Sequence, residues 1–231
     1  MKQATVVVIG GLSGIGRAVA ERAAAEGARV IALGRRAPPA DWPKHLEAGQ
    51  LDISDDAAVE GFFRQLGALD HLVVTSGPVL ASAKLAELDV NAAKDAFDVK
   101  VFGQLRAAKH AARCIAKTGS ITLTSGLLAR KAVPGGLVKA TMNAAIEIMG
   151  KTLAKELAPV RVNVVSPGMV ETGMWGDLSE ADRKAMAARA GSGLPVGRVG
   201  QASDLAQAYW LVMTNGFMTG AVIDVDGGGL L

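Results

Sequence analysis

The feature that most constrains the fold is the segment 5–34, TVVVIGGLSGIGRAVAERAAAEGARVIALG. Its β-branched run 5–10 stops at glycine, which is typical of a strand buried on both faces. Residues 13–28 have helical spacing, and Gly27 lies where a left-handed C-terminal cap costs little. Residues 29–34 are a second strand-like run. A strand, a glycine loop, a helix and a strand form one βαβ unit, whose crossover is expected to be right-handed.

The same alternation continues along the chain. Further strands are expected near 51 and at 69–77, 119–126, 160–168 and 221–229, and further helices at 54–67, 91–117 and 137–158. We therefore predict an α/β fold, a Rossmann-like doubly wound parallel sheet, in a single domain over residues 1–231.

Two segments between these elements carry their own expectations. Three prolines make 35–50 an irregular segment, and Ser54 is expected to cap the helix that follows. Residues 173–200 are rich in glycine, methionine and charge, and are expected to form a mobile lid.

Composition excludes several classes of protein. The charges are mixed, 25 basic against 22 acidic residues, and no basic run is interleaved with aromatics, so nucleic acid is not expected as a partner. The single cysteine, Cys114, suits a reducing compartment. The N-terminal apolar run is too short for a signal peptide, and no segment reaches the roughly 18 apolar residues of a membrane span. We expect a cytoplasmic protein without a membrane partner. The histidines His45, His71 and His110 are too dispersed for a metal site.

The glycine loop GGLSGIG lies between the first predicted strand and helix, with Gly10, Gly14 and Gly16 as its spaced glycines. Glycines allow a sharp turn and a close approach to a pyrophosphate, and the helix N-terminus offers free N–H groups. A purely structural turn is the alternative. Between a buried strand and an amphipathic helix, the loop favours dinucleotide binding.

Several motifs in order carry a resemblance to the short-chain dehydrogenase/reductase family over nearly the whole chain. LDIS resembles the family's adenine-contacting element, RVNVVSPGMVET its Asn-x-x-x-Pro-Gly element through Asn163, and LPVGRVGQASDLAQAYWLV…MTGAVIDVDGG its C-terminal signature. The resemblance implies cofactor contacts at Gly10, Leu12, Ser13, Gly14, Ile15, Gly16, Asp52, Ile53, Ser76, Gly77, Pro167, Gly168, Val170 and Thr172.

The end of the second strand indicates which nicotinamide cofactor is used. An NAD enzyme usually places an acidic residue there, whereas this chain has Gly34 followed by Arg35 and Arg36. A guanidinium can bind a 2′-phosphate with two charge-assisted hydrogen bonds. The alternative is that both arginines are solvated loop charges. We predict NADP(H) as the cofactor.

The catalytic positions of the family hold unusual residues here. The family surrounds the nicotinamide with Asn, Ser, Tyr and Lys. The alignment of NAAIEIMGKTLAKELAP with the family places Asn143 at the Lys position and Lys139, four residues earlier on the same helix face, at the Tyr position. FDVKVFG places Lys100 at the Asn position, and TLTSG places a glycine at the Ser position, with Ser125 just before it. The only tyrosine, Tyr209, is expected on a buried helix face.

Two of these departures are reciprocal, because Lys100 stands for Asn and Asn143 for Lys. A swap keeps one cation and one amide in the same place, which argues against a decayed site. Lys139 is then the candidate proton donor, and like-charge repulsion from Lys100 is expected to lower its pKa. Ser125 is the candidate hydroxyl at the carbonyl. A solvated Lys139 and a Ser125 that caps its own backbone are the alternatives.

The function that this pattern favours is an NADP(H)-dependent oxidoreductase acting on a small-molecule carbonyl or alcohol. One alternative is a catalytically silent NADP(H)-binding protein, a sensor or a structural partner, and another is lyase or isomerase chemistry on the same fold. Methionines and a tryptophan around the lid, Met169, Met174, Trp175 and Met186, suggest a partly apolar substrate or core packing. Apolar faces on the helices 91–117 and 137–158 predict a homodimer or homotetramer.

Overall fold

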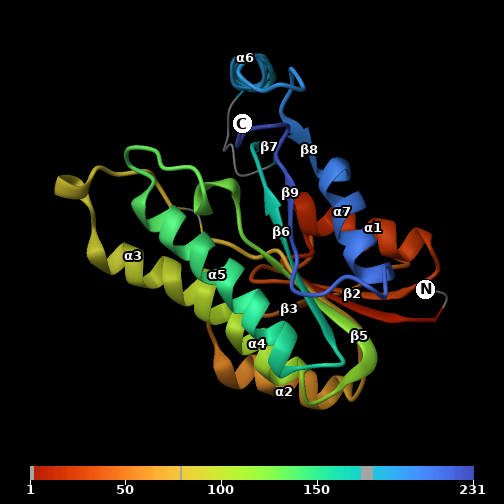
Figure 1. Ribbon diagram of the computed structural model, residues 1–231. Helices are drawn as coiled ribbons and strands as arrows, with labels where there is room; N and C mark the ends of the chain where they lie inside the picture. The colour runs from red at the N-terminus through yellow and green to blue at the C-terminus, as the bar shows by residue number, and fades with distance from the viewer. Residues whose placement is uncertain (1–2, 79, 173–178) are drawn as a thin grey trace.

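The computed structural model describes residues 3–78, 80–172 and 179–231. Within them, seven parallel strands form one sheet in the order β3-β2-β1-β4-β5-β6-β9 (Figure 1). The strands of this sheet are β1 Thr5–Ile9, β2 Arg29–Gly34, β3 Glu47–Gln50, β4 Leu69–Val74, β5 Ile115–Thr124, β6 Arg161–Pro167 and β9 Val222–Val225. The predicted doubly wound α/β fold is confirmed.

Helices cover both faces of the sheet. They are α1 Gly14–Ala25, α2 Asp56–Leu66, α3 Val90–Phe97, α4 Gly103–Ala111, α5 Leu137–Glu156, α6 Glu180–Gly191 and α7 Ala202–Thr214, with short 3₁₀ turns η1 Leu85–Glu87 and η3 Leu127–Ala129. Helices α2, α4 and α5 share one core with the sheet, and α1 and α7 share the other.

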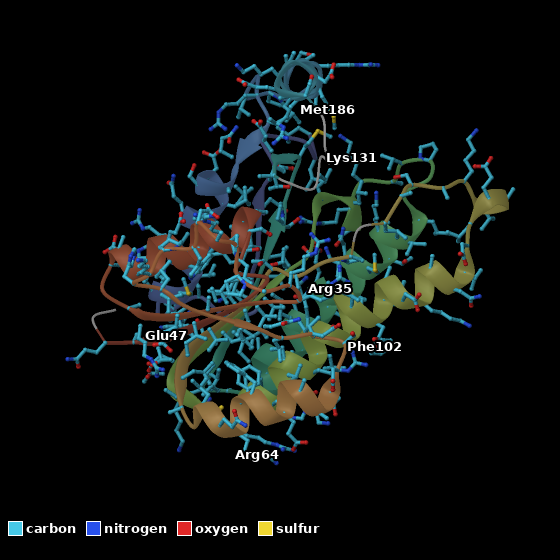
Figure 2. The ribbon with its side chains drawn as sticks, turned by 180° about the vertical axis from the view of Figure 1, so that it is seen from behind. Arg35, Glu47, Arg64, Phe102, Lys131 and Met186 are labelled. Atoms are coloured by element: carbon cyan, nitrogen blue, oxygen red, sulfur yellow. The ribbon has the colours of Figure 1, made fainter. Side chains whose placement is uncertain are left out.

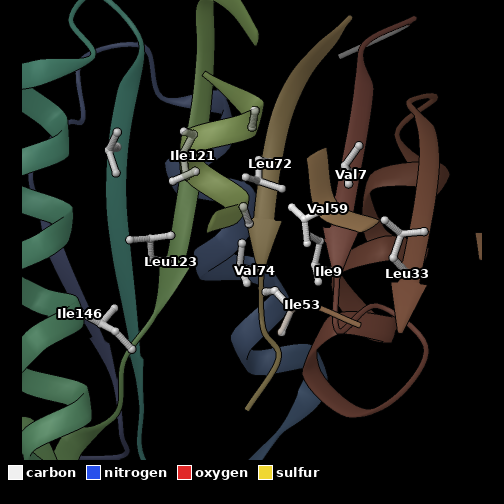
Figure 3. Close-up of a cluster of buried hydrophobic side chains, with 14 of the residues drawn as sticks. Val7, Ile9, Leu33, Ile53, Val59, Leu72, Val74, Ile121, Leu123 and Ile146 are labelled. Carbon is white, nitrogen blue, oxygen red and sulfur yellow. The ribbon is translucent and has the colours of Figure 1, made fainter. Parts of the chain in front are cut away.

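Strand β1 shows why the central strands carry continuous apolar runs. Val7 and Ile9 point into the core beneath α2, α4 and α5 (Figure 3). Val6 and Val8 belong to the other core, beneath α1 and α7. All four are essentially inaccessible to solvent. A strand covered on both faces has no polar side, so its sequence does not alternate.

Two local expectations in the first half of the chain are wrong. Residues 35–50 are not irregular throughout, because Glu47–Gln50 pairs with β2 as the edge strand β3. Its sequence EAGQ lacks the β-branched residues that signal a strand, and backbone pairing alone defines it. The N-cap of α2 is Asp55, whose carboxylate accepts from the Ala58 N–H, and not Ser54.

The expected long helix at 91–117 is divided. Helix α3 passes into a π-helical turn, η2 Asp98–Phe102, before α4 begins, and β5 already starts at Ile115. Arg106 spans the turn by donating to both the carboxylate and the carbonyl of Asp98. Gly103 follows the turn and packs closely against Ile53. A Cβ on Gly103 would lie 2.9 Å from Cγ2 of Ile53. Single π turns of this kind occur frequently at functional sites.

The predicted lid is described only in part. Residues 173–178, including Met174 and Trp175, lie outside the described residues. Beyond them, α6 lies above the carboxyl ends of the strands (Figure 1), and the short strands β7 Val170–Glu171 and β8 Gly200–Gln201 pair with each other beneath it. The mobility of this segment stays a prediction. Met169 and Met186 are both more than 40% exposed, so they do not belong to the core.

Candidate active site

The carboxyl ends of the parallel strands meet at one edge of the sheet. The strand order reverses between β1 and β4, and the loops after these two strands diverge there to leave a crevice, the usual ligand position in such sheets. The sequence-predicted residues that follow β1, β2, β4, β5 and β6 are thereby brought to the same edge.

The loop after β1 has almost no room for side chains. Gly10 has a φ of +86°, and a Cβ on it would lie 2.6 Å from the backbone nitrogen of Ser76. A Cβ on Gly16 would lie 2.1 Å from the carbonyl oxygen of Gly10. Ser13 is the N-cap of α1, and its exposed side chain makes no capping hydrogen bond. The first turn of α1 therefore opens as a glycine-lined helix N-terminus, which suits an anionic group.

Ser76, at the end of β4, faces this loop with an unused hydroxyl. Its Oγ is enclosed and has no hydrogen-bond partner among the described residues. Thr172 closes the loop from the β6 side, with its Cβ 3.5 Å from the position of a Cβ on Gly14. Buried hydroxyls normally find a partner, so the free Ser76 Oγ points to a ligand in the crevice.

Four more of the predicted cofactor residues are placed by packing. Ile53 is buried against Gly103, and Val170 is buried in β7. Gly168 lies so close to Asp226 that a Cβ would approach its Cα to 2.5 Å. Pro167 ends β6 in register with Val225 of β9. These residues shape the crevice wall, while Ile15 is half-buried on α1 and Gly77 is exposed after β4.

At the end of β2, Gly34 is covered by Leu12. A Cβ at position 34 would lie 2.9 Å from Cδ1 of Leu12, so an acidic side chain does not fit there without a shift. Arg35 and Arg36 are exposed, and neither forms an ion pair with a described residue. In the view of Figure 2, Arg35 and Lys131 both lie below α6. Two cations that form no close ion pair with a described residue thus follow Gly34.

Asp52 lies close to this pair. Its carboxylate accepts from the hydroxyl and the backbone N–H of Ser54, which lowers its pKa, and Arg35 lowers it further. Asp52 is therefore ionised and fixed by Ser54 at the edge of the crevice.

Lys100 lies on the π-helical turn, and it is partly buried. The Nζ atom donates to the carbonyl oxygen of Ser125 at 3.1 Å. Burial lowers its pKa from 10.5 to about 8. Desolvation, and not repulsion from another cation, causes this lowered pKa of Lys100.

Asn143 lies on α5 and packs against Gly126, the residue after Ser125. It is 6% exposed, and a Cβ on Gly126 would lie 2.9 Å from its Nδ2 atom. Its Oδ1 is enclosed and has no hydrogen-bond partner among the described residues. Lys100 and Asn143 thus contact the consecutive residues Ser125 and Gly126, which brings the two swapped side chains to one place.

Ser125 is oriented differently from the expectation. Its Oγ donates to Oε1 of Glu147, 3.3 Å away. Glu147 also pairs with Arg130, which in turn binds Asp224 of β9 and the hydroxyl of Ser166. The sequence analysis missed Glu147 and Arg130. The only signal for Glu147 is its position four residues after Asn143, on the same helix face.

Lys139 begins the same helix one turn earlier. Its Nζ donates to Oγ of Ser82, in the segment after β4, at 3.1 Å. The side chain makes no ion pair with any described residue. A loop hydroxyl and an unpaired ammonium therefore face each other at the entrance to the site. No motif or spacing in the sequence points to Ser82.

Tyr209 is fully buried on α7, as expected. Its hydroxyl shares a 2.6 Å hydrogen bond with Thr124 Oγ1, and burial raises its pKa. Gln104, also fully buried, binds the backbone N–H and carbonyl of Thr124. These contacts hold the end of β5 just before Ser125. Tyr209, the only tyrosine of the chain, therefore has a structural role.

Within residues 3–78, 80–172 and 179–231, no cluster of three or more His, Cys, Asp or Glu is arranged to hold a metal ion. No described helix is both long and apolar enough to cross a membrane.

Comparison with known proteins places the chain in one family. The family model described as enoyl-(acyl carrier protein) reductase matches residues 10–229. The short-chain dehydrogenase/reductase ucsE of Acremonium sp is 33% identical over 255 residues, covering 100% of this chain and 97% of that protein. The human 3-oxoacyl-[acyl-carrier-protein] reductase is 29% identical over 234 residues, covering 96% of this chain and 95% of its own.

Solved structures show the same fold. A small-chain dehydrogenase in complex with NADPH has a TM-score of 0.87 and 46% sequence identity, with 99% of each chain covered. A short-chain dehydrogenase/reductase from Serratia marcescens has a TM-score of 0.87 and 28% identity, covering 100% of this chain and 99% of that one. The chain belongs to the short-chain dehydrogenase/reductase family of oxidoreductases.

Proposed function

We propose that the protein is an NADP(H)-dependent oxidoreductase that interconverts a small carbonyl compound and its alcohol through a rewired catalytic site. The family and the reductase names of its relatives support the reaction class. The observation that carries the proposal is the pair Lys100 and Asn143, which contacts Ser125 and Gly126 at the carboxyl edge of the sheet. A decayed site has no reason to keep a costly, partly buried ammonium at this point.

The crevice fits a phosphorylated dinucleotide on three counts. The loop at Gly10 and Gly16 leaves no room for side chains, the Ser76 hydroxyl lacks a partner, and Arg35 and Arg36 form no close ion pair among the described residues. A solved relative binds NADPH. When bound, the nicotinamide supplies or accepts the hydride.

The chain's own residues handle the proton and the charge. Lys139, with Ser82 as its hydrogen-bond partner, donates a proton to the substrate oxygen during reduction and takes it back during oxidation. The Lys100 ammonium supplies a fixed positive charge behind Ser125. The Ser125 hydroxyl is bound to Glu147, so it assists at the carbonyl only if that contact opens.

Turnover of NADPH with a panel of aldehydes and ketones tests the reaction. Lys139→Met is expected to lower kcat by about 10²–10⁴-fold, the usual contribution of a positioned proton donor, with little change in NADPH affinity. The matched control is Lys151→Met, an exposed lysine on the far half of α5, which should leave turnover unchanged.

Two outcomes would contradict the proposal. Normal turnover by Lys139→Met removes the lysine from the reaction. NADPH binding without turnover of any carbonyl or alcohol favours the silent cofactor-binding protein, and conversion of a substrate without a change in nicotinamide absorbance favours lyase or isomerase chemistry.

Cofactor choice is tested separately by calorimetry with NADPH and NADH. NADPH should bind more tightly than NADH, and Arg35→Ala should weaken NADPH alone by about ten- to a hundredfold, because a charge-assisted contact to the 2′-phosphate is lost. Arg64→Ala, an exposed arginine on the last turn of α2, is the control. Equal affinities of the wild-type protein for the two cofactors would reject the assignment.

A further inference from the structure

Reduction of a carbonyl places negative charge on its oxygen, and a fixed hydrogen-bond donor at that oxygen speeds the reaction. Few groups at the carboxyl end of β5 could supply this hydrogen-bond donor. Gly126 has no side chain, and the hydroxyl of Ser125 is committed to Glu147 at 3.3 Å. The hydroxyl of Thr124 is committed to the carbonyl of Val74 and to Tyr209. A donor for the substrate oxygen has to come from another element.

Asn143 meets this requirement. Its side chain occupies the space directly above Gly126, where a Cβ would lie 2.9 Å from Nδ2 and 3.4 Å from Cγ. The residue is only 6% exposed. Its Oδ1 is enclosed without a hydrogen-bond partner among the described residues, whereas its Nδ2 is not enclosed and donates to none of them. An N–H donor that no described residue uses is available to an acceptor on a ligand, such as a carbonyl oxygen.

The helix places this amide beside the proposed proton donor. Asn143 follows Lys139 by four residues on α5, so the two side chains share one face of the helix. The Lys100 ammonium lies against the carbonyl of Ser125, where it favours negative charge nearby.

We infer that Asn143 is a catalytic residue whose Nδ2 N–H donates a hydrogen bond to the substrate's carbonyl oxygen, and that Gly126 is a glycine because this amide occupies the space of a side chain. The inference rests on the proposed function, since it needs a carbonyl substrate. The substrate oxygen then has two partners: Lys139 donates the proton, and Asn143 donates a hydrogen bond.

The test uses the carbonyl substrate that the wild-type protein reduces fastest. Asn143→Asp keeps the shape and removes the N–H donor, and Asn143→Ala removes the amide. Both should lower kcat by about 10²–10³-fold, the usual effect of losing one such donor, while KM and NADPH affinity change much less. A purely structural role would instead appear as a lower melting temperature and weaker NADPH binding. Thr141→Ala, exposed on the same helix, is the control for the substitutions.

Gly126→Ser tests two claims separately: that Asn143 fills the space beside Gly126, and that a donor is needed at this place. In the wild-type background the new side chain crowds Nδ2 and should lower kcat. In the Asn143→Ala background there is room for the serine, and its hydroxyl should raise kcat at least tenfold above Asn143→Ala alone. A substitution that harms one background and rescues the other is not expected from general destabilisation.

The outcomes distinguish the inference from the proposed function. If the wild-type protein reduces carbonyls and both Asn143→Asp and Asn143→Ala stay within threefold of its kcat, the inference is overturned and the proposed function stands. If the wild-type protein binds NADPH but reduces nothing in the panel, the proposed function fails and takes the inference with it. Loss of kcat in both variants with rescue by Gly126→Ser supports the inference.

Discussion

Lys100 is an unusual side chain for a protein to bury, because desolvation opposes its charge. Its pKa of about 8 expresses that cost: burial favours the neutral amine over the ammonium. The single hydrogen bond to the Ser125 carbonyl offsets only part of the cost. A residue that destabilises its own fold is expected where it serves a function.

The stability of Lys100→Met should reveal this cost. Between pH 8 and 10.5 the unfolded chain holds the lysine proton more strongly than the folded one, so the contribution of Lys100 to folding improves by up to about 3 kcal/mol as pH rises. At pH 7, Lys100→Met removes that cost and loses one hydrogen bond, so the free energy of unfolding should rise by about 1–2 kcal/mol.

Urea denaturation of the wild-type protein and the variant at pH 7 and at pH 10 measures this difference. The advantage of Lys100→Met should shrink at the higher pH, where the wild-type amine is already neutral. A variant that is less stable at pH 7 would show that the ammonium is not desolvated as the structure places it.

At the scale of the elements, the π-helical turn between α3 and α4 is the device that brings Lys100 to the end of β5. A regular α-helix through residues 91–117 turns each side chain by a fixed angle, and one extra residue in a turn changes which side chains face the sheet. Arg106 bridges the turn through two hydrogen bonds to Asp98, so the turn is held from outside the site.

Removing the bridge should loosen the turn. Arg106→Ala is expected to lower the free energy of unfolding by about 1 kcal/mol, because the pair is only partly exposed and also binds a backbone carbonyl. Hydrogen exchange of the backbone amides at 98–103 should become faster. Arg113→Ala breaks a more exposed pair with Glu60, and it should change stability by less than about 0.5 kcal/mol without affecting these amides. Equal exchange rates in both variants would show that Arg106 does not hold the turn.

The elements also show how far the sequence predicts the structure. The buried strands and the glycine loop were predictable, because periodicity and glycine spacing are local signals, as for Val7 and Gly10. The π turn was not, since Lys100 and its neighbours have ordinary helical spacing and only the contact with Ser125 and the bridge from Arg106 distinguish it. Strand β3 was missed because Glu47–Gln50 carries no strand propensity and takes its conformation from β2.

The candidate site also has a part that the sequence predicts and a part that it does not. The preference for NADP(H) was predicted from consecutive residues of one loop, because Gly34 and Arg35 follow a predicted strand directly. The catalytic side depends on side-chain directions across three elements, which a sequence does not contain. The orientation of Ser125 toward Glu147 and the packing of Asn143 on Gly126 therefore emerge only from the structure.

At the scale of the whole molecule, one flank exposes more apolar surface than the sheet can cover. Val90 is 60% exposed, Phe102 48% and Ile148 62%, all on the segment from α3 to α5. Val90, Phe97 and Phe102 also line a shallow apolar hollow of about 360 Å³. Contiguous exposed apolar surface of this kind usually marks an interface.

A homodimer or homotetramer through these helices is therefore expected. Light scattering after size-exclusion chromatography should give at least twice the monomer mass at micromolar concentration, and Phe102→Asp with Ile148→Asp should reduce it to the monomer, because a charge in an apolar interface is not solvated. Phe217→Asp alters another exposed phenylalanine, 99% exposed beyond α7, and should leave the mass unchanged. A monomeric wild-type protein would refute this expectation.

The buried Tyr209 also gives the molecule a single tyrosine as an optical reporter. Because the chain contains one tyrosine, and because its hydroxyl is bound to Thr124 directly beneath Ser125, any tyrosine signal comes from one known position. Its raised pKa keeps the phenol neutral while it is buried. The ultraviolet absorbance of tyrosinate therefore reports the opening of the packing under the site, and the chain carries this label without any chemical modification.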